Sequence, residues 1–190
     1  MRFIPKISKW FMETTTWTKA LLWLVASQIV YFIMISVTIP AIENHGNDLR
    51  IFDLMPFGYS HQYAITLLEG LGEQGRHIYL TNQIPLDLIY PGLMGVTGAL
   101  FISLLSKKTN PSLGVFVALP IIASIFDYLE NFMIAAMLLF YPNVKSTIVT
   151  LSSIFTMTKS ILTTVYLVLL LVLFSMFFYK VVRFRRKKSY

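Results

Sequence analysis

Four long apolar segments alternate with short polar ones along this chain of 190 residues. The apolar segments cover residues 20–40, 80–106, 113–141 and 148–179. Each is long enough for the about 20 residues that a helix needs to cross the hydrocarbon core of a bilayer. The pattern therefore predicts one all-α integral membrane domain over residues 1–190, built as a bundle of four transmembrane helices.

The composition agrees with this class. Hydrophobic residues make up 56% of the chain and charged residues 13%, whereas a soluble domain carries roughly 25% charged residues. The chain has no cysteine, which excludes disulfide exchange, thiolate catalysis and thiolate metal sites.

Basic residues set the expected orientation in the membrane. They gather before the first apolar segment, between the second and third at Lys107 and Lys108, and after the fourth over residues 180–188. The positive-inside rule then predicts both termini in the cytoplasm and the outer loop, residues 41–79, on the other side. The net charge of +7 reflects this topology, with anionic membrane lipid rather than nucleic acid as the partner.

The outer loop contains one segment with helical periodicity. Ser60 is suited to cap a helix over residues 60–71, and Tyr63, Leu67 and Leu71 fall on one face of that helix. Such an amphipathic helix lies on the membrane surface or across the mouth of the bundle. An interfacial anchor and a functional lid both remain open.

Three carboxylic acids and one amine interrupt the apolar segments: Asp87, Asp127, Glu130 and Lys159. A charged side chain at mid-bilayer costs at least about 2.5–3.5 kcal/mol, so such residues usually face the protein interior and carry function. We expect a polar pocket in which Lys159 pairs with Asp87 or Asp127. Because the acids outnumber the amine, at least one acid is expected to hold a proton.

Helical spacing groups the polar residues into stripes that we expect to face inward. The stripe on the second helix is Arg76, Tyr79, Gln83, Asp87 and Tyr90. The third helix carries Ser124, Asp127 and Asn131, with Glu130 beside them, and the fourth carries Ser152, Thr156, Lys159, Thr163 and Tyr166. The first helix offers Ser27 or Gln28, and Tyr31.

The chemistry of these residues suggests their roles. Asp127 and Glu130 are the acid–base candidates. Lys159 and Arg76 would hold an anionic or carbonyl group, with Asp87 orienting Lys159. The expected ligand-binding set is completed by Tyr79, Gln83, Tyr90, Asn131 and Thr156. Glu130 has no evident cation of its own, so we expect Glu130→Gln to leave the bundle folded and Lys159→Met to destabilise it.

Other chemistries find less support in the sequence. His45, His61 and His77 match no compact metal motif, and no metal site is predicted from them. A hard cation held by oxygen ligands remains an alternative, with the ligands drawn from Asp87, Asp127, Glu130 and His77. No Ser-His-Asp pattern, phosphate-binding glycine loop or dinucleotide fingerprint is present, so the sequence identifies no cofactor.

Five short blocks resemble a family of small four-helix bacterial membrane proteins with no assigned activity. The blocks are FDLMPFGY (52–59), GEQGRHIY (72–79), PLDLIYP (85–91), DYLEN (127–131) and TMTK (156–159). The resemblance covers roughly residues 51–163 and implies the four-helix topology. The size and buried carboxylates are also similar to the sterol-isomerase and sigma-2-receptor superfamily, whose cavities accept lipid-like molecules. Lys159 and the block at 72–79 have no counterpart there.

The leading interpretation is a membrane protein that binds a small amphipathic or lipid-derived molecule in an outward-facing pocket, with or without acid–base chemistry on it. One alternative is proton- or cation-coupled transport, which would need a homo-oligomer because four helices leave a narrow path. The apolar residues 165–178 oppose a continuous pore. Another alternative is a non-catalytic assembly subunit. The membrane would be the plasma (inner) membrane of a bacterium or the endoplasmic reticulum of a eukaryote.

Overall fold

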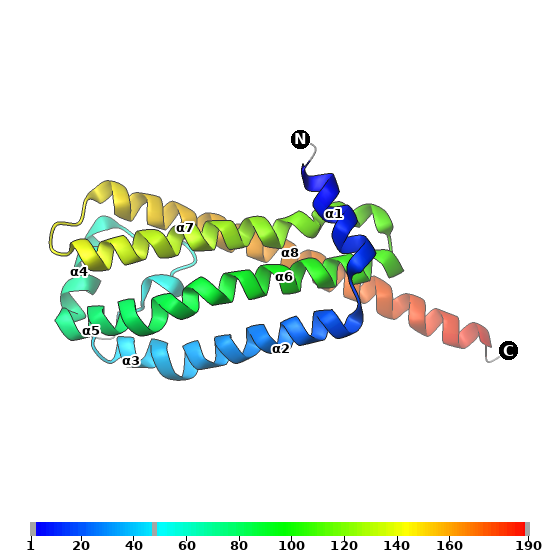
Figure 1. Cartoon of the computed structure of the whole chain (residues 1–190), viewed down its shortest axis with the longest axis horizontal. Coiled ribbons are helices and arrows are strands. Elements are labelled where there is room, and N and C mark those ends of the chain that lie inside the picture. The colour runs from blue at the N-terminus through cyan, green and yellow to red at the C-terminus, as the bar shows by residue number, and fades with distance from the viewer. Residues whose placement is uncertain (1–2, 47–48, 189–190) are drawn as a thin grey trace.

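The computed structural model describes residues 3–46 and 49–188, and this part of the chain contains helices and connecting loops but no strand (Figure 1). Four helical stretches are long and apolar enough to cross a membrane: Trp17–Glu43, Gly72–Lys108, Pro111–Phe140 and Ser146–Phe184. The predicted four-helix organisation is confirmed and indicates an integral membrane protein. The second stretch begins at Gly72 rather than near residue 80, because its helix continues into the polar residues before the apolar segment.

The first two stretches each contain a widened π-helical turn. The first stretch is α2 (Trp17–Ile33), η1 (Met34–Thr38) and α3 (Ile39–Glu43). The second is α5 (Gly72–Ile78), η3 (Tyr79–Gln83) and α6 (Ile84–Lys108). Both π-turns end two residues before a proline, Pro40 and Pro85. Proline has no backbone N–H and crowds the preceding turn, so a wider turn relieves the clash.

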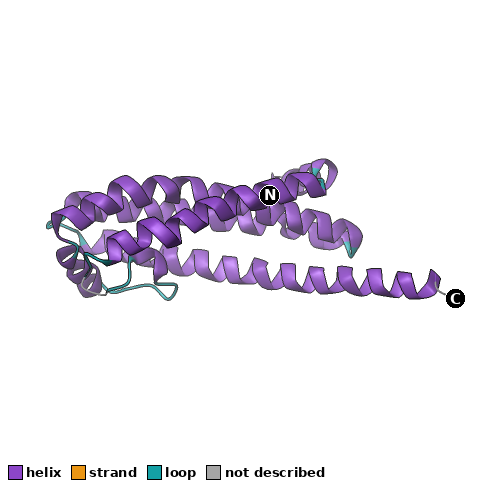
Figure 2. Ribbon diagram, turned by 90° about the horizontal axis from the view of Figure 1, so that it is seen from below, coloured by secondary structure: helices purple, strands orange, loops and turns teal. Residues whose placement is uncertain are grey.

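The other two stretches pack closely against the second. They are η4 (Pro111–Val117) with α7 (Ala118–Phe140), and α8 (Ser146–Lys188). α7 contacts both α6 and α8, and α2 packs on α6. A Cβ on Gly95 of α6 would lie 2.1 Å from the Ser124 Oγ of α7, so this contact requires glycine. Figure 2 shows the C-terminal part of α8 extending beyond the other helices.

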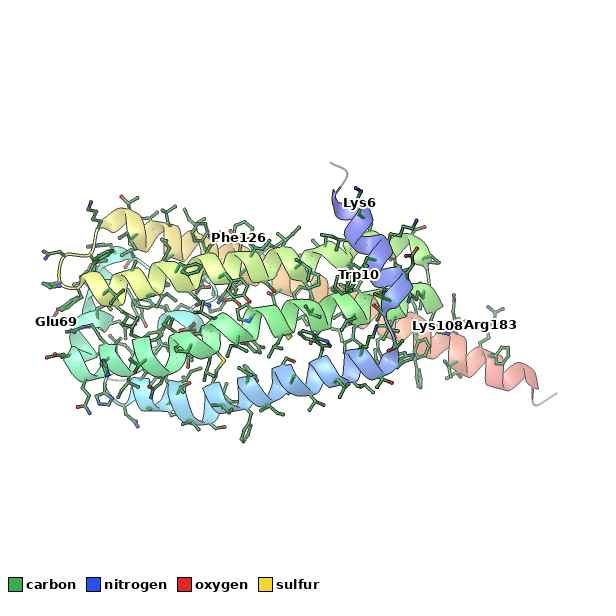
Figure 3. The ribbon with its side chains drawn as sticks, viewed as in Figure 1. Lys6, Trp10, Glu69, Lys108, Phe126 and Arg183 are labelled. Carbon is green, nitrogen blue, oxygen red and sulfur yellow. The ribbon has the colours of Figure 1, made fainter. Side chains whose placement is uncertain are left out.

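An N-terminal helix, α1 (Phe3–Thr14), lies across one end of the bundle (Figure 1). It is joined to α6 by hydrogen bonds from Ser103 Oγ to the Phe11 carbonyl (2.9 Å) and from Lys107 Nζ to the Thr15 carbonyl (3.2 Å). The sequence analysis did not predict this helix. Figure 3 shows Lys6, Lys108 and Arg183 toward this end and Glu69 at the opposite end.

The segment between the first and second stretches contains two further helices, η2 (Phe52–Leu54) and α4 (His61–Gly70). The expected helix over 60–71 is present as α4, and Ser60 Oγ accepts a hydrogen bond from the Tyr63 N–H at 3.1 Å, as a cap should. Its buried residues are Ala64, Leu67 and Leu68. Gly72 then turns the chain into α5 with a φ of +60°, which glycine adopts at little cost.

Two apolar clusters form the core, and the polar residues lie between them. On α7, Ala123 belongs to one cluster and Ile134 to the other. On α8, Val149 belongs to the cluster of Ile134, and Leu173 belongs to the cluster of Ala123. Asp127, Glu130 and Lys159 therefore occupy a polar band in the interior of the bundle, away from both of its ends.

Candidate functional site

The centre of the site is an ion-pair triad between α7 and α8. Lys159 Nζ lies 2.8 Å from Asp127 Oδ1 and 2.5 Å from Glu130 Oε2. Asp127 and Glu130 are three residues apart, so α7 presents both carboxylates on one face. The predicted pairing of Lys159 is confirmed for Asp127. The expectation that Glu130 has no cation is wrong, because Lys159 contacts both acids.

A second side chain of α8 holds Glu130 from the other side. The Thr156 hydroxyl donates to Glu130 Oε1 at 2.8 Å and also lies 3.0 Å from the Ser152 carbonyl. The side chain of Glu130 is 0% exposed, whereas those of Lys159 and Asp127 are 16% and 23% exposed. Glu130 is therefore enclosed behind Lys159, and Asp127 is the more accessible acid.

A polar network with no ion pair runs from η1 to α7. The Thr38 hydroxyl of η1 donates to Gln83 Oε1, and Gln83 Nε2 donates to Asp87 Oδ1 at 2.9 Å. Asn131 Nδ2 then donates to the Asp87 carbonyl at 2.9 Å and lies 3.4 Å from Asp127 Oδ1. The expectation that Asp87 orients Lys159 is not met, because Asp87 is held by the Gln83 amide.

Two oxygen atoms of this network have no partner in the part of the chain that the structure describes. Asp87 Oδ2 and Asn131 Oδ1 are buried without a hydrogen bond. Asp87 is 3% exposed and Asn131 is 1% exposed. The sequence identified Asp87, Gln83 and Asn131, but Thr38 was missed because a lone threonine near a helix end is an ordinary residue.

The loop of residues 51–59 folds into the bundle beside this site (Figure 1, cyan). At its start Ile51 and Phe52 are 0% exposed, and the Tyr79 hydroxyl donates to Asp53 Oδ2. At its end the Tyr59 N–H donates to Ser153 Oγ at 2.9 Å, and the Tyr59 hydroxyl donates to Ser152 Oγ at 2.7 Å. The loop is therefore fastened to the second helical stretch on one side and to α8 on the other.

Asp53 is, with Thr38, a residue near the site that the sequence did not identify. Burial raises the pKa of its carboxyl above the ordinary value of 3.8, against the lowering effects of Lys159 and of the Tyr79 hydrogen bond. Asp127 raises this pKa further, so Asp53 is in electrostatic contact with the triad. The sequence signal that could have identified Asp53 is an acid placed between two apolar residues, Phe52 and Leu54, in a loop.

Arg76 lies away from the triad. Its Nη1 donates to the Leu68 carbonyl at 2.7 Å, and its guanidinium carbon lies 4.3 Å from the centre of the Tyr141 ring. Arg76 therefore ties α5 to α4 and to the end of α7. The predicted role for Arg76, holding a ligand beside Lys159, does not fit this position.

Of the remaining candidates, Tyr90 and Tyr31 lie near the site, whereas Ser27 and Gln28 do not contact it. Tyr90 lies near the triad and stacks on Tyr31 with ring centres 5.6 Å apart. Gln28 is exposed, and Ser27 is buried with its hydroxyl bonded to the Leu24 carbonyl of its own helix. The first membrane stretch, Trp17–Glu43, thus contributes Tyr31 and Thr38 to the surroundings of the site.

A cavity of about 310 Å³ adjoins the triad. Its charged lining residues are Asp127 and Lys159, and its hydroxyl-bearing lining residues are Tyr90, Ser160, Thr163, Thr164 and Tyr166. Pro56 of the inserted loop and Met94 complete the wall. No residue of α4 lines this cavity, so the loop tip, rather than the predicted helix over 60–71, borders it.

The arrangement offers ionic, hydrogen-bonding and proton-transfer chemistry. Over residues 3–46 and 49–188, no group of three or more metal-ligating side chains comes together. His45 Nδ1 lies 2.9 Å from the Ala41 carbonyl and His61 Nε2 lies 3.4 Å from the Val144 carbonyl. These two histidines therefore have local structural contacts away from the triad.

No family model, curated protein or solved structure matches the chain. The resemblance to the bacterial four-helix family therefore stays a prediction, and the site is interpreted from its own geometry.

Proposed function

We propose that this membrane protein binds the polar head group of a small amphipathic or lipid-derived molecule in the cavity beside Asp127 and Lys159. One observation carries the proposal: two charged side chains inside a helix bundle border an open space of about 310 Å³. Intramembrane ionisable residues that face a cavity generally mark a binding or transport site.

The chemistry of the lining favours a head group that donates hydrogen bonds and carries no negative charge. Lys159 is already engaged by two carboxylates, so it has little attraction left for an anion. With both acids ionised, the triad has a net charge of −1. Asp127 Oδ2 has no hydrogen-bond partner among the described residues, and it remains available as an acceptor. An alcohol or an amine fits this lining better than the anionic group expected from the sequence.

Any acid–base step would use Asp127. Its side chain is accessible, whereas Glu130 is fully enclosed and contacts Lys159 and Thr156. Asp127 is therefore the group able to exchange a proton with a bound molecule. Glu130 is better suited to fix the position and charge of Lys159.

We further propose that both termini lie in the cytoplasm. The supporting observation is that Lys6, Lys108 and Arg183 lie toward the same end of the molecule (Figure 3), as the positive-inside rule requires. The membrane would be the plasma membrane in a bacterium or the endoplasmic reticulum in a eukaryote.

Photolabelling in phosphatidylcholine nanodiscs tests the proposed ligand class. The probes are hexadecanol, hexadecylamine and hexadecanoic acid, each carrying a diazirine close to the head group. We expect the alcohol and the amine to label Tyr90 or Tyr166 more than the acid does. Thr163→Phe should remove this labelling by filling the cavity, whereas Thr158→Phe, on the same helix but outside the cavity, should not. Equal labelling in both variants, or equal labelling by all three probes, would contradict the proposal.

Proton- or cation-coupled transport is the second candidate, and one observation favours it. The unpartnered Asp87 Oδ2 is a buried acceptor that a proton or a cation would satisfy. The apolar cluster with Phe11, Leu105 and Leu173 separates the polar band from the α1 end and opposes a continuous path. A proton flux across proteoliposomes that Asp87→Asn abolishes would favour transport over binding. If neither labelling nor flux is found, the assembly-subunit alternative gains support.

A further inference from the structure

We propose that the apolar tail of the bound molecule lies in a groove on the lipid-facing side of α8, and that the molecule enters the cavity sideways from the bilayer. This inference rests on the proposed function. The groove has a volume of about 540 Å³, and its apolar walls are Phe57, Met157, Ile161 and Val165. We call it the tail groove.

The tail groove and the head-group cavity adjoin each other. Pro56, Ser160 and Thr164 line both of them. Both charged and all five hydroxyl-bearing side chains border the cavity, whereas the side chains that border the groove alone are all apolar. An amphipathic molecule has this same division, with a polar end and an apolar end. The occupant that fits the pair of spaces is therefore a single alkyl chain attached to a small polar head.

The position of the groove along α8 indicates that it faces the hydrocarbon core of the bilayer. Ile161 lies on α8 well inside the stretch Ser146–Phe184, about 22 Å from its start at the 1.5 Å rise of an α-helix. Ile161 and Val165 are 64% and 49% exposed. Side chains exposed at such depth contact acyl chains rather than water. A tail in this groove leaves the bilayer core without crossing a polar layer.

The tip of the inserted loop forms the opposite wall of the groove. Phe57 is 92% exposed, although the loop is fastened on both sides of it by Phe52 and Tyr59. The turn at Gly58 has a φ of +79°, and a Cβ there would lie 2.4 Å from Ser153 Oγ. Only glycine allows the loop to lie this close to α8, and the close approach holds Phe57 beside Met157. The opening between cavity and bilayer is thus bordered by an aromatic side chain at the end of a short turn.

Two hexadecanol probes test this inference in phosphatidylcholine nanodiscs. One carries its diazirine close to the hydroxyl and the other close to the tail end. We expect the first to label the cavity at Tyr90 or Tyr166 and the second to label the groove at Phe57, Met157 or Ile161. Ile161→Trp should abolish labelling by the tail-end probe at Phe57. Leu171→Trp, at a similarly exposed position of α8 outside the groove, should leave it unchanged.

The two probes separate failure of this inference from failure of the proposed function. Cavity labelling by the first probe, with tail-end labelling spread evenly over the lipid-facing surfaces of α2 and α8, would mean annular lipid only. That outcome overturns the tail groove and leaves the head-group cavity standing. Loss of cavity labelling as well would overturn both. Unchanged groove labelling in Ile161→Trp would also contradict the inference.

Discussion

Two polar networks share the interior of this bundle, and they solve the problem of buried carboxyl groups differently. In the triad, Asp127 and Glu130 are matched with a cation, Lys159. In the network from Thr38 to Asn131, the Asp87 carboxylate accepts a hydrogen bond, among the described residues, only from the neutral Gln83 amide. The triad borders a cavity, whereas Asp87 is enclosed. Charge is therefore concentrated where a ligand would contact it, and the enclosed network depends on hydrogen bonds alone.

The largest expected effect comes from removing the cation of the triad. Lys159→Met leaves Asp127 and Glu130 facing each other without compensation, which should lower the free energy of unfolding by about 3–5 kcal/mol. Unfolding by sodium dodecyl sulfate, followed by tryptophan fluorescence, measures this. Lys145→Met, at an exposed lysine of the loop before α8, is the control. A Lys159→Met protein as stable as the control would mean that the triad is not a charge-balanced unit.

Removing one acid of the triad should have an intermediate effect. Glu130→Gln keeps an acceptor for Thr156 but loses the ionic contact with Lys159, and we expect a loss of about 1–3 kcal/mol. This revises the sequence-based expectation of near-normal stability. The exposed Glu69→Gln serves as the control. If the same unfolding titration shows that Glu130→Gln lowers the free energy of unfolding as much as Lys159→Met does, this prediction is wrong.

The enclosed network should tolerate loss of its acid. Asp87→Asn retains an oxygen for Gln83 Nε2 and removes a carboxyl that has no cation, so stability should stay within about 1 kcal/mol of wild type or rise. Asp127→Asn, in the triad, should cost more. If Asp87→Asn proves the more damaging of the two, the difference between the networks disappears.

The smallest expected effect is a pH dependence from Asp53. Its pKa is raised in the folded protein, so its contribution to stability is fully present below pH 3.8 and is lost as the pH rises through the folded pKa. Acidification should therefore raise the melting temperature through this group, and Asp53→Asn should flatten that rise. Glu73 is an exposed acid of α5, so Glu73→Gln should give the same dependence of melting temperature on pH as wild type. A profile unchanged by Asp53→Asn would remove Asp53 from the site.

Sequence patterns predicted the membrane helices well, because apolar length is a direct requirement of the bilayer. They also predicted that Lys159 pairs with Asp127, because buried charges must find partners, but they did not predict that Glu130 shares the same cation. Arg76 shows where the reasoning by helical spacing failed. The π-turn η3 lies between Arg76 and Asp87, and one extra residue in a turn shifts later side chains by about 100° around the helix axis. Residues on either side of the turn therefore do not share the predicted face.

Asp53 and α1 could not be predicted from the same patterns for a different reason. The position of Asp53 depends on contacts of the loop with Tyr79 and α8, which are distant in sequence. α1 is held by the hydrogen bond from Ser103 to the Phe11 carbonyl and by packing of Phe11 in an apolar cluster with residues distant in sequence. Both segments contain apolar residues, but neither is the long apolar run that marks a membrane helix, so hydropathy does not predict their positions in the bundle. Spacing within one element predicts which residues share a face, but not which loop will cover that face.

The two ends of α8 are attached to different parts of the molecule, and this has a mechanical consequence. Near its start, Ser152 and Ser153 hold the inserted loop, and near its end Lys180 Nζ donates to the Lys108 and Thr109 carbonyls at 3.2 and 2.7 Å. These anchors are about 40 Å apart at the rise of an α-helix. Sliding of α8 along its axis by one residue would break the hydrogen bonds at one of these two places. The two sets of contacts therefore hold α8, and Lys159 with it, at a fixed level relative to Asp127 and Glu130.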